Sequence, residues 1–349
     1  MRNKITVLLF LIILLLAFVF LVEKVGIQNS STSKSLSVDS LPSPTPPFYS
    51  VPLSIASMRA KSYPGSDIQI VQTLTPGSNY KQYIASYKSD GLTIYGLLTV
   101  PDGTAPKGGW PAIIFNHGYI PPEQYVTTER YVAYVDAFAR DGFVVFKSDY
   151  RGNGNSEGQP EGAYYSTSYA TDVLNALSSV KRLSYVNPNK IGMWGHSMGG
   201  NITLRALVVD PNDIKAAVIW GGVVGSYNDL IYNWQRRVPF VPSPKELQNR
   251  NRGRQMFLAK YGTPSQNPAF WNSIDPTYYL SDIKAPVQLD VGGADEEVPV
   301  AFSQSLYQKL QLANKTAQYF EYPGSDHNIS QGFDLAMQRS VQFFDKYLK

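Results

Sequence analysis

From about residue 80 onward, short apolar runs alternate with stretches that have the period of an amphipathic helix. The apolar runs are rich in β-branched and aromatic residues and mostly end in Gly or Asp, which is typical of buried parallel strands. Six such runs cover 111–118, 142–149, 190–197, 216–222, 286–293 and 317–324. Helical patterns lie between and after them at 130–142, 169–183, 200–209, 301–313 and 333–349. Because strand–helix–strand units cross over in a right-handed sense, this alternation predicts a mostly parallel sheet with helices on both faces.

Two features extend this α/β pattern. The runs 81–89 and 92–100 flank Asp90-Gly91, which is a strong signal for a β-hairpin. Residues 226–280 form an excursion that is too long for an ordinary connection between a strand and a helix. We expect this excursion to be a helical cap over the carboxyl ends of the strands, where open α/β sheets bind ligands.

Residues 195–199 read Gly-His-Ser-Met-Gly, between a strand-like run and a helical pattern. The bare pattern G-x-S-x-G is weak because Gly and Ser are common in turns. Between a strand and a helix, however, it predicts a sharp turn whose strained backbone needs glycine on both sides of the serine. Ser197 is therefore the candidate nucleophile. The backbone N–H of Met198, at the start of the following helix, is a candidate donor to the developing oxyanion.

A nucleophilic serine needs a base, and in such a fold the chain order is serine, then Asp or Glu, then histidine. Of the three histidines, only His327 follows Ser197, and it comes just after the last strand-like run. Asp295 follows the preceding run and is the expected acid that orients His327. Three neighbouring carboxylates are alternatives for this role: Glu296, Glu297 and Asp326.

The loop after the run at 111–116 is the expected place for a second oxyanion donor. His117-Gly118 makes the turn there, and the backbone N–H of Tyr119 is the candidate donor. The alternative is that Tyr119 is only a wall of the pocket. We expect His196 to support the packing of its loop, because it precedes the acid in the chain and does not fit the order required of the base.

Together these segments resemble the catalytic domain of the prolyl oligopeptidase family of α/β-hydrolases. The resemblance covers about residues 80–349 and includes "DGLTIYGLLTVP", "NHGY", "SDYRGNGNSEG", "GHSMGG", "GADEEVP" and "YPGSDHN". It implies an α/β-hydrolase fold with a mostly parallel eight-stranded sheet and a helical cap. It also implies a serine peptidase that cuts short peptides through an acyl-enzyme, without a cofactor. Residue matching makes Ser197, Asp295 and His327 the catalytic triad, and Tyr119 and Met198 the oxyanion donors. Asp149 and Arg151 match a family loop and are expected to be structural.

The chain also departs from well-known members of that family, which carry an N-terminal β-propeller. The residues between 26 and 79 are too few for even two blades of about 40 residues each. Since the fold itself does not choose between amide and ester substrates, a carboxylesterase acting on small esters or cell-envelope acyl groups is the alternative to a peptidase. A non-catalytic binding protein that kept the fold is a third hypothesis.

The expected cap is rich in arginine and aromatic residues. They are Arg236, Arg237, Arg250, Arg252 and Arg254, with Tyr227, Tyr232, Trp234 and Trp271. One interpretation is that the arginines bind an anionic group of the substrate. The other is a solvated helix face whose aromatic residues pack inward.

The N-terminal 79 residues are expected to lie outside the catalytic domain. Residues 5–22 carry no charge and would span roughly 27 Å as a helix, close to the hydrocarbon thickness of a bilayer, so we expect a membrane anchor within residues 1–25. A cleaved signal peptide is the alternative. Arg2 and Lys4 favour a cytoplasmic N-terminus and hence an extracytoplasmic catalytic domain. Residues 26–79 read as a Ser/Pro-rich stalk and lead-in.

Composition excludes several classes of function. The chain has no cysteine, which excludes disulfides, thiol catalysis and cysteine-ligated metals. Three histidines, two of them placed in the expected site loops, offer no ligand cluster of familiar spacing, so no metal is expected. The net charge of +4 is small and not concentrated in a run, so nothing calls for nucleic acid. The expected partners are a small peptide or ester substrate and, through the anchor, membrane lipid.

Overall fold

The computed structural model describes residues 51–236 and 244–349, with the backbone alone for 244–252. The expected anchor within residues 1–25, residues 26–50 of the expected stalk, and the side chains of Arg237, Arg250 and Arg252 lie outside the described residues. Within the described ranges, no helix is both long enough and apolar enough to cross a membrane.

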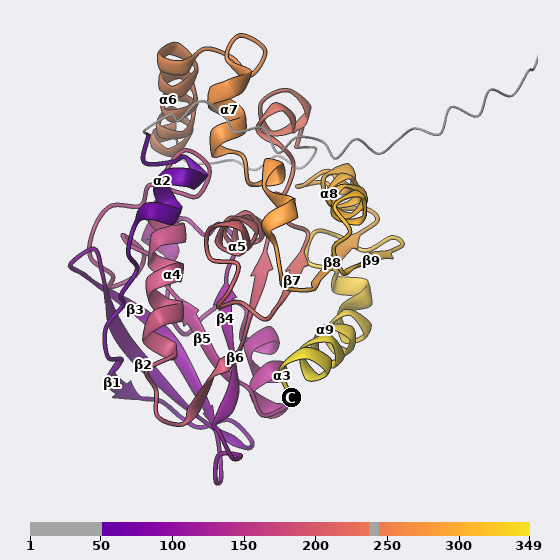
Figure 1. The fold of residues 1–349 in the computed structure, drawn as a ribbon. Helices are drawn as coiled ribbons and strands as arrows, with labels where there is room; N and C mark the ends of the chain where they lie inside the picture. The colour runs from indigo at the N-terminus through magenta and orange to yellow at the C-terminus, as the bar shows by residue number, and fades with distance from the viewer. Residues whose placement is uncertain (1–50, 237–243) are drawn as a thin grey trace, which may run out of the picture. The chain divides into compact units, whose positions relative to one another are not determined.

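The described part of the chain is built around one nine-stranded sheet with the order β1-β2-β3-β5-β4-β6-β7-β8-β9 (Figure 1). The strands are β1 (Gln69–Thr73), β2 (Tyr80–Ser89), β3 (Leu92–Pro101), β4 (Trp110–Asn116), β5 (Val144–Ser148), β6 (Val186–His196), β7 (Ala216–Trp220), β8 (Val287–Gly292) and β9 (Ala317–Tyr322). β1, β2, β3 and β5 pair antiparallel, and every pair from β5 across to β9 is parallel. The expected mostly parallel α/β-hydrolase sheet is therefore present.

The expectation of eight strands was wrong by one, because β1 adds a ninth strand at the edge of the sheet. Each residue of β1 is exposed, and Ile70 and Val71 are adjacent and each about half exposed. The sequence of β1 therefore shows neither a buried run nor an alternation of apolar and polar residues. Its strand conformation depends on pairing with the edge of β2, which the local sequence does not reveal.

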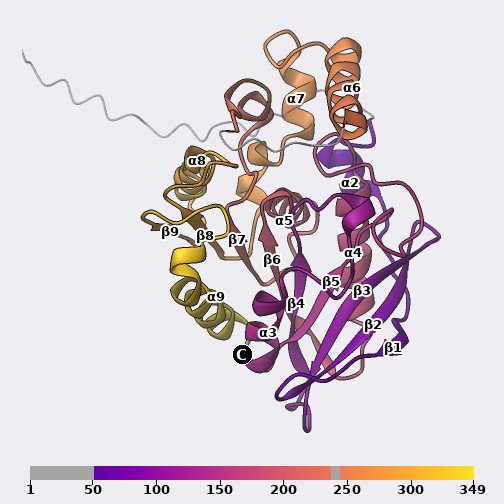
Figure 2. The same cartoon turned by 180° about the vertical axis from the view of Figure 1, so that it is seen from behind.

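Helices cover both faces of the sheet (Figures 1 and 2). They are α2 (Ile55–Ala60), α3 (Val132–Arg140), α4 (Ser168–Val180), α5 (Met198–Val209), α6 (Pro244–Tyr261), α7 (Pro268–Ile274), α8 (Val300–Leu312) and α9 (Phe333–Leu348). Five short turns of other helix types complete the described elements: η1 (Pro122–Gln124), η2 (Asp229–Asn233), η3 (Pro276–Tyr278), η4 (Leu280–Asp282) and η5 (Ser330–Gly332). One core cluster joins the sheet to α2, α4, α5 and α8, and another joins it to α3 and α9.

The alternation of side chains along the central strands explains these two cores. On β4, Ile114 faces the first cluster while Ile113 and Phe115 face the second. All of these side chains are completely buried. A strand that is apolar on both faces reads as a continuous run, which is why the sequence indicated buried parallel strands.

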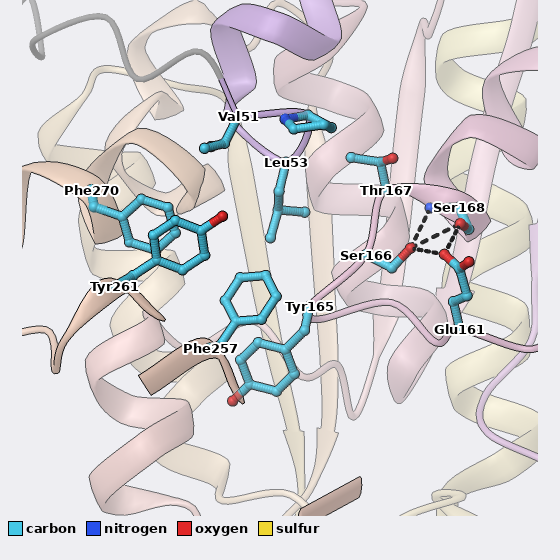
Figure 3. Close-up of a pocket in the computed structure, with 11 residues that line it drawn as sticks. Val51, Leu53, Glu161, Tyr165, Ser166, Thr167, Ser168, Phe257, Tyr261 and Phe270 are labelled. Atoms are coloured by element: carbon cyan, nitrogen blue, oxygen red, sulfur yellow. Dashed lines mark hydrogen bonds between the residues drawn. The ribbon is translucent and has the colours of Figure 1, made fainter. Parts of the chain in front are cut away.

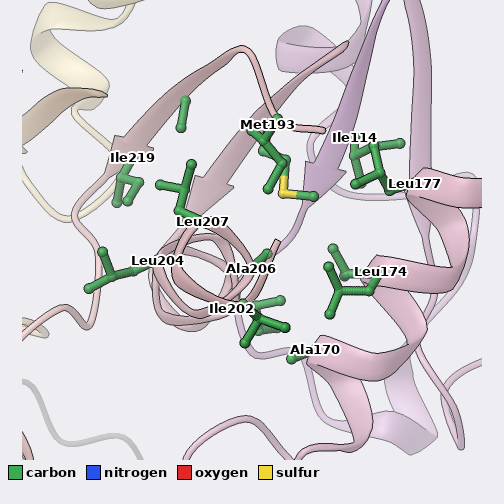
Figure 4. Packing of buried hydrophobic residues seen from close by; sticks show 14 of the residues in the cluster. Ile114, Ala170, Leu174, Leu177, Met193, Ile202, Leu204, Ala206, Leu207 and Ile219 are labelled. Atoms are coloured by element: carbon green, nitrogen blue, oxygen red, sulfur yellow. The ribbon is translucent and has the colours of Figure 1, made fainter. Parts of the chain in front are cut away.

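Helix α5 is buried along its whole length and packs on the sheet beside α4. Figure 4 shows Ile202 and Leu207 of α5 among side chains from the sheet and from α4, such as Met193 and Leu174. Each apolar side chain buried in this way stabilises the fold by roughly 1.5–3 kcal/mol. The N-terminus of α5, which carries the candidate nucleophile, is thus fixed by packing on several sides.

The excursion at 226–280 contains η2, α6, α7, η3 and, at its end, the start of η4. Its apolar residues form a third cluster that includes Phe270 and Trp271 of α7 and Leu53 of the lead-in. From α5, the buried guanidinium of Arg205 donates hydrogen bonds to the carbonyl of Ile274 at 3.1 Å and to the hydroxyl of Tyr227 at 3.0 Å. This one side chain therefore links the core helix to the base of the excursion.

Candidate active site

Ser197 lies at a sharp turn between β6 and α5. Its backbone has φ 55° and ψ −118°, a strained conformation for a residue with a side chain. A Cβ at Gly195 would lie 2.3 Å from Oγ1 of Thr203, and a Cβ at Gly199 would lie 1.9 Å from the carbonyl oxygen of Asn116. Only glycine fits at both positions, which gives the G-x-S-x-G pattern its physical cause here.

Asp295 and His327 are hydrogen-bonded to each other, although 32 residues separate them in the chain. Nδ1 of His327 lies 2.7 Å from Oδ2 of Asp295, whose side chain is fully buried. Oδ1 of Asp295 accepts the backbone N–H groups of Glu297 at 2.8 Å and Val298 at 2.9 Å. A carboxylate can only accept, so Nδ1 carries a proton, and in the neutral imidazole Nε2 keeps its lone pair. Nε2 is thereby available as a base.

His327 and Ser197 lie at the same end of the sheet. A Cβ at Gly221 would lie 3.1 Å from Nδ1 and 3.2 Å from Cε1 of His327, so the imidazole lies directly against Gly221. The preceding residue, Trp220, accepts the backbone N–H of Ser197 through its carbonyl at 3.0 Å. The ring of His196 is 4.6 Å, centroid to centroid, from the ring of His327. The base candidate therefore lies beside the immediate neighbours of the nucleophile candidate.

The other carboxylates near Asp295 and His327 have different partners. Glu297 forms an ion pair with Arg236 of the cap. Asp326 accepts the backbone N–H groups of Asn328 at 3.1 Å and Ser330 at 2.8 Å and so shapes the loop. Glu296 is exposed.

The two oxyanion candidates belong to two chain segments that both adjoin Ser197. Met198 is the first residue of α5, where backbone N–H groups have no partner inside the helix. Tyr119 follows Gly118, and a Cβ at Gly118 would lie only 3.1 Å from Cβ of Ser197. The N–H of Gly118 itself donates to the hydroxyl of Tyr131 at 2.9 Å. The loop of Tyr119 is therefore packed directly against the serine.

The other two histidines are buried and neutral. His117 is stacked between Tyr125 and Tyr150, and burial together with the nearby Lys147 lowers its pKa from 6.5 to about 3. Burial, reinforced by His327, lowers the pKa of His196 to about 3 as well. Neither imidazole can take up a proton near neutral pH.

Sequence reasoning missed Tyr131, which touches both sides of this site. Its hydroxyl lies 2.9 Å from the N–H of Gly118 and 2.8 Å from Nδ1 of His196. The sequence places Tyr131 in a helical pattern with no catalytic motif around it. The unusual feature of Tyr131 is its backbone conformation, which only the structure shows. Arg130 and Tyr131 are consecutive non-glycine residues with φ 56° and 54°.

The family model of the prolyl oligopeptidase family matches residues 130–349, which is more than half of the chain. The chain belongs to the prolyl oligopeptidase family. The resemblance seen in the sequence is thus confirmed. The family membership makes this chain a serine hydrolase.

Individual relatives of this family member include both peptidases and an esterase. The uncharacterized peptidase YtmA of Bacillus subtilis (strain 168) is 27% identical over 253 residues, which cover 72% of this chain and 88% of YtmA. The acetyl xylan esterase from Paenibacillus sp. R4 has a TM-score of 0.63 at 20% identity and covers 84% of this chain and 92% of its own. The Pyrococcus horikoshii acylaminoacyl peptidase has a TM-score of 0.61 at 21% identity, covering 78% of this chain but 43% of its own. At such identities, the two structures show the shared α/β-hydrolase fold.

The cap of this family member contacts the acid loop through Trp234 and Arg236. Nε1 of Trp234 donates to the carbonyl of Glu297 at 2.8 Å, and Arg236 pairs with the Glu297 carboxylate. Arg254 instead donates to the carbonyl of Ile231 at 2.7 Å, within the cap. Of the two described cap arginines, one therefore lies at the acid loop and one holds the cap together.

A cavity of about 290 Å³ lies at the base of the cap (Figure 3). Its aromatic wall consists of Tyr165, Phe257, Tyr261 and Phe270, and the carboxylate of Glu161, which Ser166 and Ser168 hold through their hydroxyl groups, lies at another side. None of the three triad candidates lines this cavity. It is therefore separate from the point at which an acyl group would be attacked.

Proposed function

We propose that this serine hydrolase cleaves short peptides through an acyl-enzyme on Ser197. The observation that carries the proposal is the hydrogen bond between Asp295 and His327, formed beside the strained turn of Ser197. In the neutral imidazole, this hydrogen bond leaves Nε2 free to accept a proton, at the same end of the sheet as Ser197, as a nucleophile and its base require.

In the proposed mechanism, Nε2 of His327 takes the proton of the Ser197 hydroxyl while Oγ attacks the carbonyl carbon of the substrate. The N–H groups of Met198 and Tyr119 stabilise the negative charge on the carbonyl oxygen. His327 then gives its proton to the leaving amine, and the acyl-enzyme forms. A water molecule, deprotonated by the same imidazole, attacks the acyl carbon. The bond between this carbon and Oγ of Ser197 then breaks, His327 returns the proton to Oγ, and the acid product leaves.

An esterase acting on small esters or cell-envelope acyl groups is the second candidate. One comparison favours it. The likeness to the acetyl xylan esterase extends over 92% of that protein, whereas the acylaminoacyl peptidase is matched over 43% of its length. More than half of the acylaminoacyl peptidase therefore lies outside the match.

Substrate profiling separates the two candidates. The purified full chain is incubated with p-nitrophenyl acetate and with aminoacyl and dipeptidyl amides, with Ser197→Ala as the matched control. We expect cleavage of at least one amide class that Ser197→Ala does not carry out. Rapid ester turnover with no amide cleavage would replace the peptidase proposal by the esterase. No turnover and no labelling of Ser197 by a fluorophosphonate probe would contradict both.

We also propose that the catalytic domain is held outside the cytoplasm by a single membrane span at residues 5–22. The support is the sequence alone, through its uncharged apolar run and the preceding Arg2 and Lys4. Membrane fractionation of the full chain and of a chain lacking residues 1–25 tests this. The full chain is expected in the membrane fraction after a carbonate wash and the shortened chain in the supernatant, whereas equal release of both would contradict the proposal.

A further inference from the structure

We infer that Tyr131 and His196 are positioning residues, whose side chains form a hydrogen-bonded bridge between the loop of the base His327 and the oxyanion loop at Gly118. The inference deepens the proposed function and rests on it, because it assigns both loops their roles. Neither bridging residue carries out a chemical step itself.

The bridge has three hydrogen bonds in a row. Nε2 of His196 lies 3.1 Å from the carbonyl oxygen of His327, a residue 131 positions later in the chain. Nδ1 of His196 lies 2.8 Å from the hydroxyl of Tyr131. The same hydroxyl lies 2.9 Å from the backbone nitrogen of Gly118. These three hydrogen bonds, all of ordinary length, therefore connect the two loops without a gap.

The direction of each bond in the bridge is fixed by its ends. The carbonyl of His327 can only accept, so Nε2 of His196 carries a proton. Because burial lowers the pKa of His196 to about 3, the ring is neutral and Nδ1 must accept. The hydroxyl of Tyr131 therefore donates to Nδ1, while its oxygen accepts the N–H of Gly118. A single arrangement of protons satisfies the whole bridge, so it is preorganised.

Packing and backbone strain also locate this bridge. His196 is 3% exposed, and the ring of Tyr131 makes edge contacts with Phe115 and His196. Arg130 and Tyr131 both occupy the left-handed region, which is unfavourable for residues with side chains. Strain of this kind persists where the surrounding structure demands it, commonly at functional sites. Tyr131 is the N-cap residue of α3, but its side chain makes no capping hydrogen bond. Its hydroxyl belongs to the bridge instead.

The bridge controls a distance that catalysis requires. His327 is held by Asp295 at its ring and by His196 at its backbone carbonyl. Gly118, at the other end, is packed against Cβ of Ser197. Without the bridge, the Asp295–His327 pair remains intact, but the base and the oxyanion N–H of Tyr119 lose their fixed separation. Both groups act together in the transition state, so losing the bridge would weaken the stabilisation of that state. We therefore expect kcat to fall while KM changes little.

The first test uses Tyr131→Phe, which keeps the ring and removes the hydroxyl. We expect kcat and the rate of Ser197 labelling by a fluorophosphonate to fall about 10- to 100-fold, the scale of a misplacement of about 1 Å, with KM changed less than about threefold. Tyr87→Phe is the matched control, because it removes a buried hydroxyl with two hydrogen bonds of 2.8 Å, to Ser148 and the carbonyl of Asp172. It is expected to lose stability but not labelling rate.

The second test separates positioning from packing at His196. His196→Gln keeps an N–H able to reach the carbonyl of His327, whereas His196→Ala keeps none. We expect the glutamine variant to recover several-fold of the kcat that the alanine variant loses, with KM nearly the same in both variants. Equal kcat in the two variants, or losses that follow the melting temperature alone, would show a structural role and overturn the inference.

The outcomes for this inference and for the proposed function are distinguishable. If the wild-type chain is neither labelled nor active, the proposed function fails and the inference fails with it. If the wild type is labelled and folded Tyr131→Phe and His196→Ala are labelled at the same rate, the inference alone is overturned. If Tyr131→Phe does not fold, the comparison of the two His196 variants decides.

Discussion

Asp295 holds His327 with one carboxylate oxygen while two backbone N–H groups fix its other oxygen. Oδ2 lies 2.7 Å from Nδ1 of His327, and Oδ1 accepts from Glu297 and Val298. The carboxylate of Asp295 therefore cannot rotate. Because Oδ2 can only accept a hydrogen bond, Nδ1 of His327 must carry a proton.

Asp295→Asn is expected to reverse that tautomer. The two backbone N–H groups would keep the amide oxygen at the position of Oδ1, so the NH2 group would point at Nδ1 of His327 and force it to accept. Nε2 would then carry the proton and could not act as a base. We expect kcat to fall by about 10³- to 10⁴-fold with little change in fold. The measurement is kcat on the best substrate, with circular dichroism to check folding.

The control for this substitution is Glu296→Gln, next to Asp295. Glu296 is an exposed carboxylate in the same loop. We expect its activity to remain within about twofold of the wild type, as for most surface substitutions. A large loss there, with an active Asp295→Asn, would move the role of the acid to Glu296.

Gly199→Ala is expected to abolish activity by displacing the turn of Ser197. The added methyl group would lie 1.9 Å from the carbonyl oxygen of Asn116, which is backbone and cannot swing aside. Overpacking of this kind costs typically about 1–3 kcal/mol and here forces α5 and its first N–H groups away from the oxyanion position. Fluorophosphonate labelling and urea unfolding measure the two effects.

Gly253→Ala is the matched glycine control. This residue lies in α6 with nothing within 4 Å of the added methyl group. Since alanine is favoured over glycine in a helix by roughly 0.5–1 kcal/mol, we expect equal or slightly higher stability and wild-type labelling. Retained labelling in Gly199→Ala would contradict the tight turn that the structure gives to Ser197.

The fold was largely predictable because its signals are local. Each of the six apolar runs corresponds to one of the strands β4 to β9, and the run pair around Asp90-Gly91 forms β2 and β3. The residues of β4, β5, β7 and β8 are almost all buried, on both faces of the sheet, so hydrophobicity along the chain was enough to find these strands. β1 was not predictable, because its exposed residues are ordered by their pairing with β2. The order of the strands in the sheet likewise depends on contacts between distant parts of the chain.

The candidate site divides in the same way. Ser197 has a local motif whose glycines have a steric cause, and Asp295 and His327 follow strands in the expected chain order. Tyr131 has no such motif, because its role arises from contacts with Gly118 and His196, which are 13 and 65 residues away. His196 is buried and neutral, in line with the expected packing role, but its two hydrogen bonds could not be read from its neighbours in the chain.

Arg205→Lys is expected to loosen the cap from the core. The buried guanidinium donates to the carbonyl of Ile274 and the hydroxyl of Tyr227, a fork that lysine cannot reproduce. Leaving a buried charge without its partners costs about 3–5 kcal/mol, so we expect a lower melting temperature and earlier proteolysis within 226–280. Arg182→Lys is the control, because its side chain is 50% exposed, and it should melt like the wild type. Equal melting of both variants would contradict the link.

Asp290 gives the stability of the protein a pH dependence of predictable sign. Burial raises the pKa of this carboxyl from 3.8 to about 7, although Gln288 and Tyr322 each donate a hydrogen bond of 2.7 Å to it. The folded state therefore binds the proton more tightly than the unfolded state. The stabilising contribution is fully present below about pH 4 and is lost as the pH rises through about 7. Above that range, the buried negative charge is a cost to the fold.

Asp290→Asn removes this titration while keeping the shape of the side chain. We expect the free energy of unfolding of the variant, relative to the wild type, to rise by on the order of 3 kcal/mol between pH 4 and pH 8, since each pKa unit corresponds to about 1.4 kcal/mol. Urea unfolding of both proteins at pH 4, 5.5, 7 and 8 measures it. Curves of stability against pH that run parallel for the two proteins would contradict the raised pKa. Asp290 lies in β8, five residues before Asp295. If Asp290→Asn keeps the wild-type kcat, the site tolerates a neutral side chain at this position.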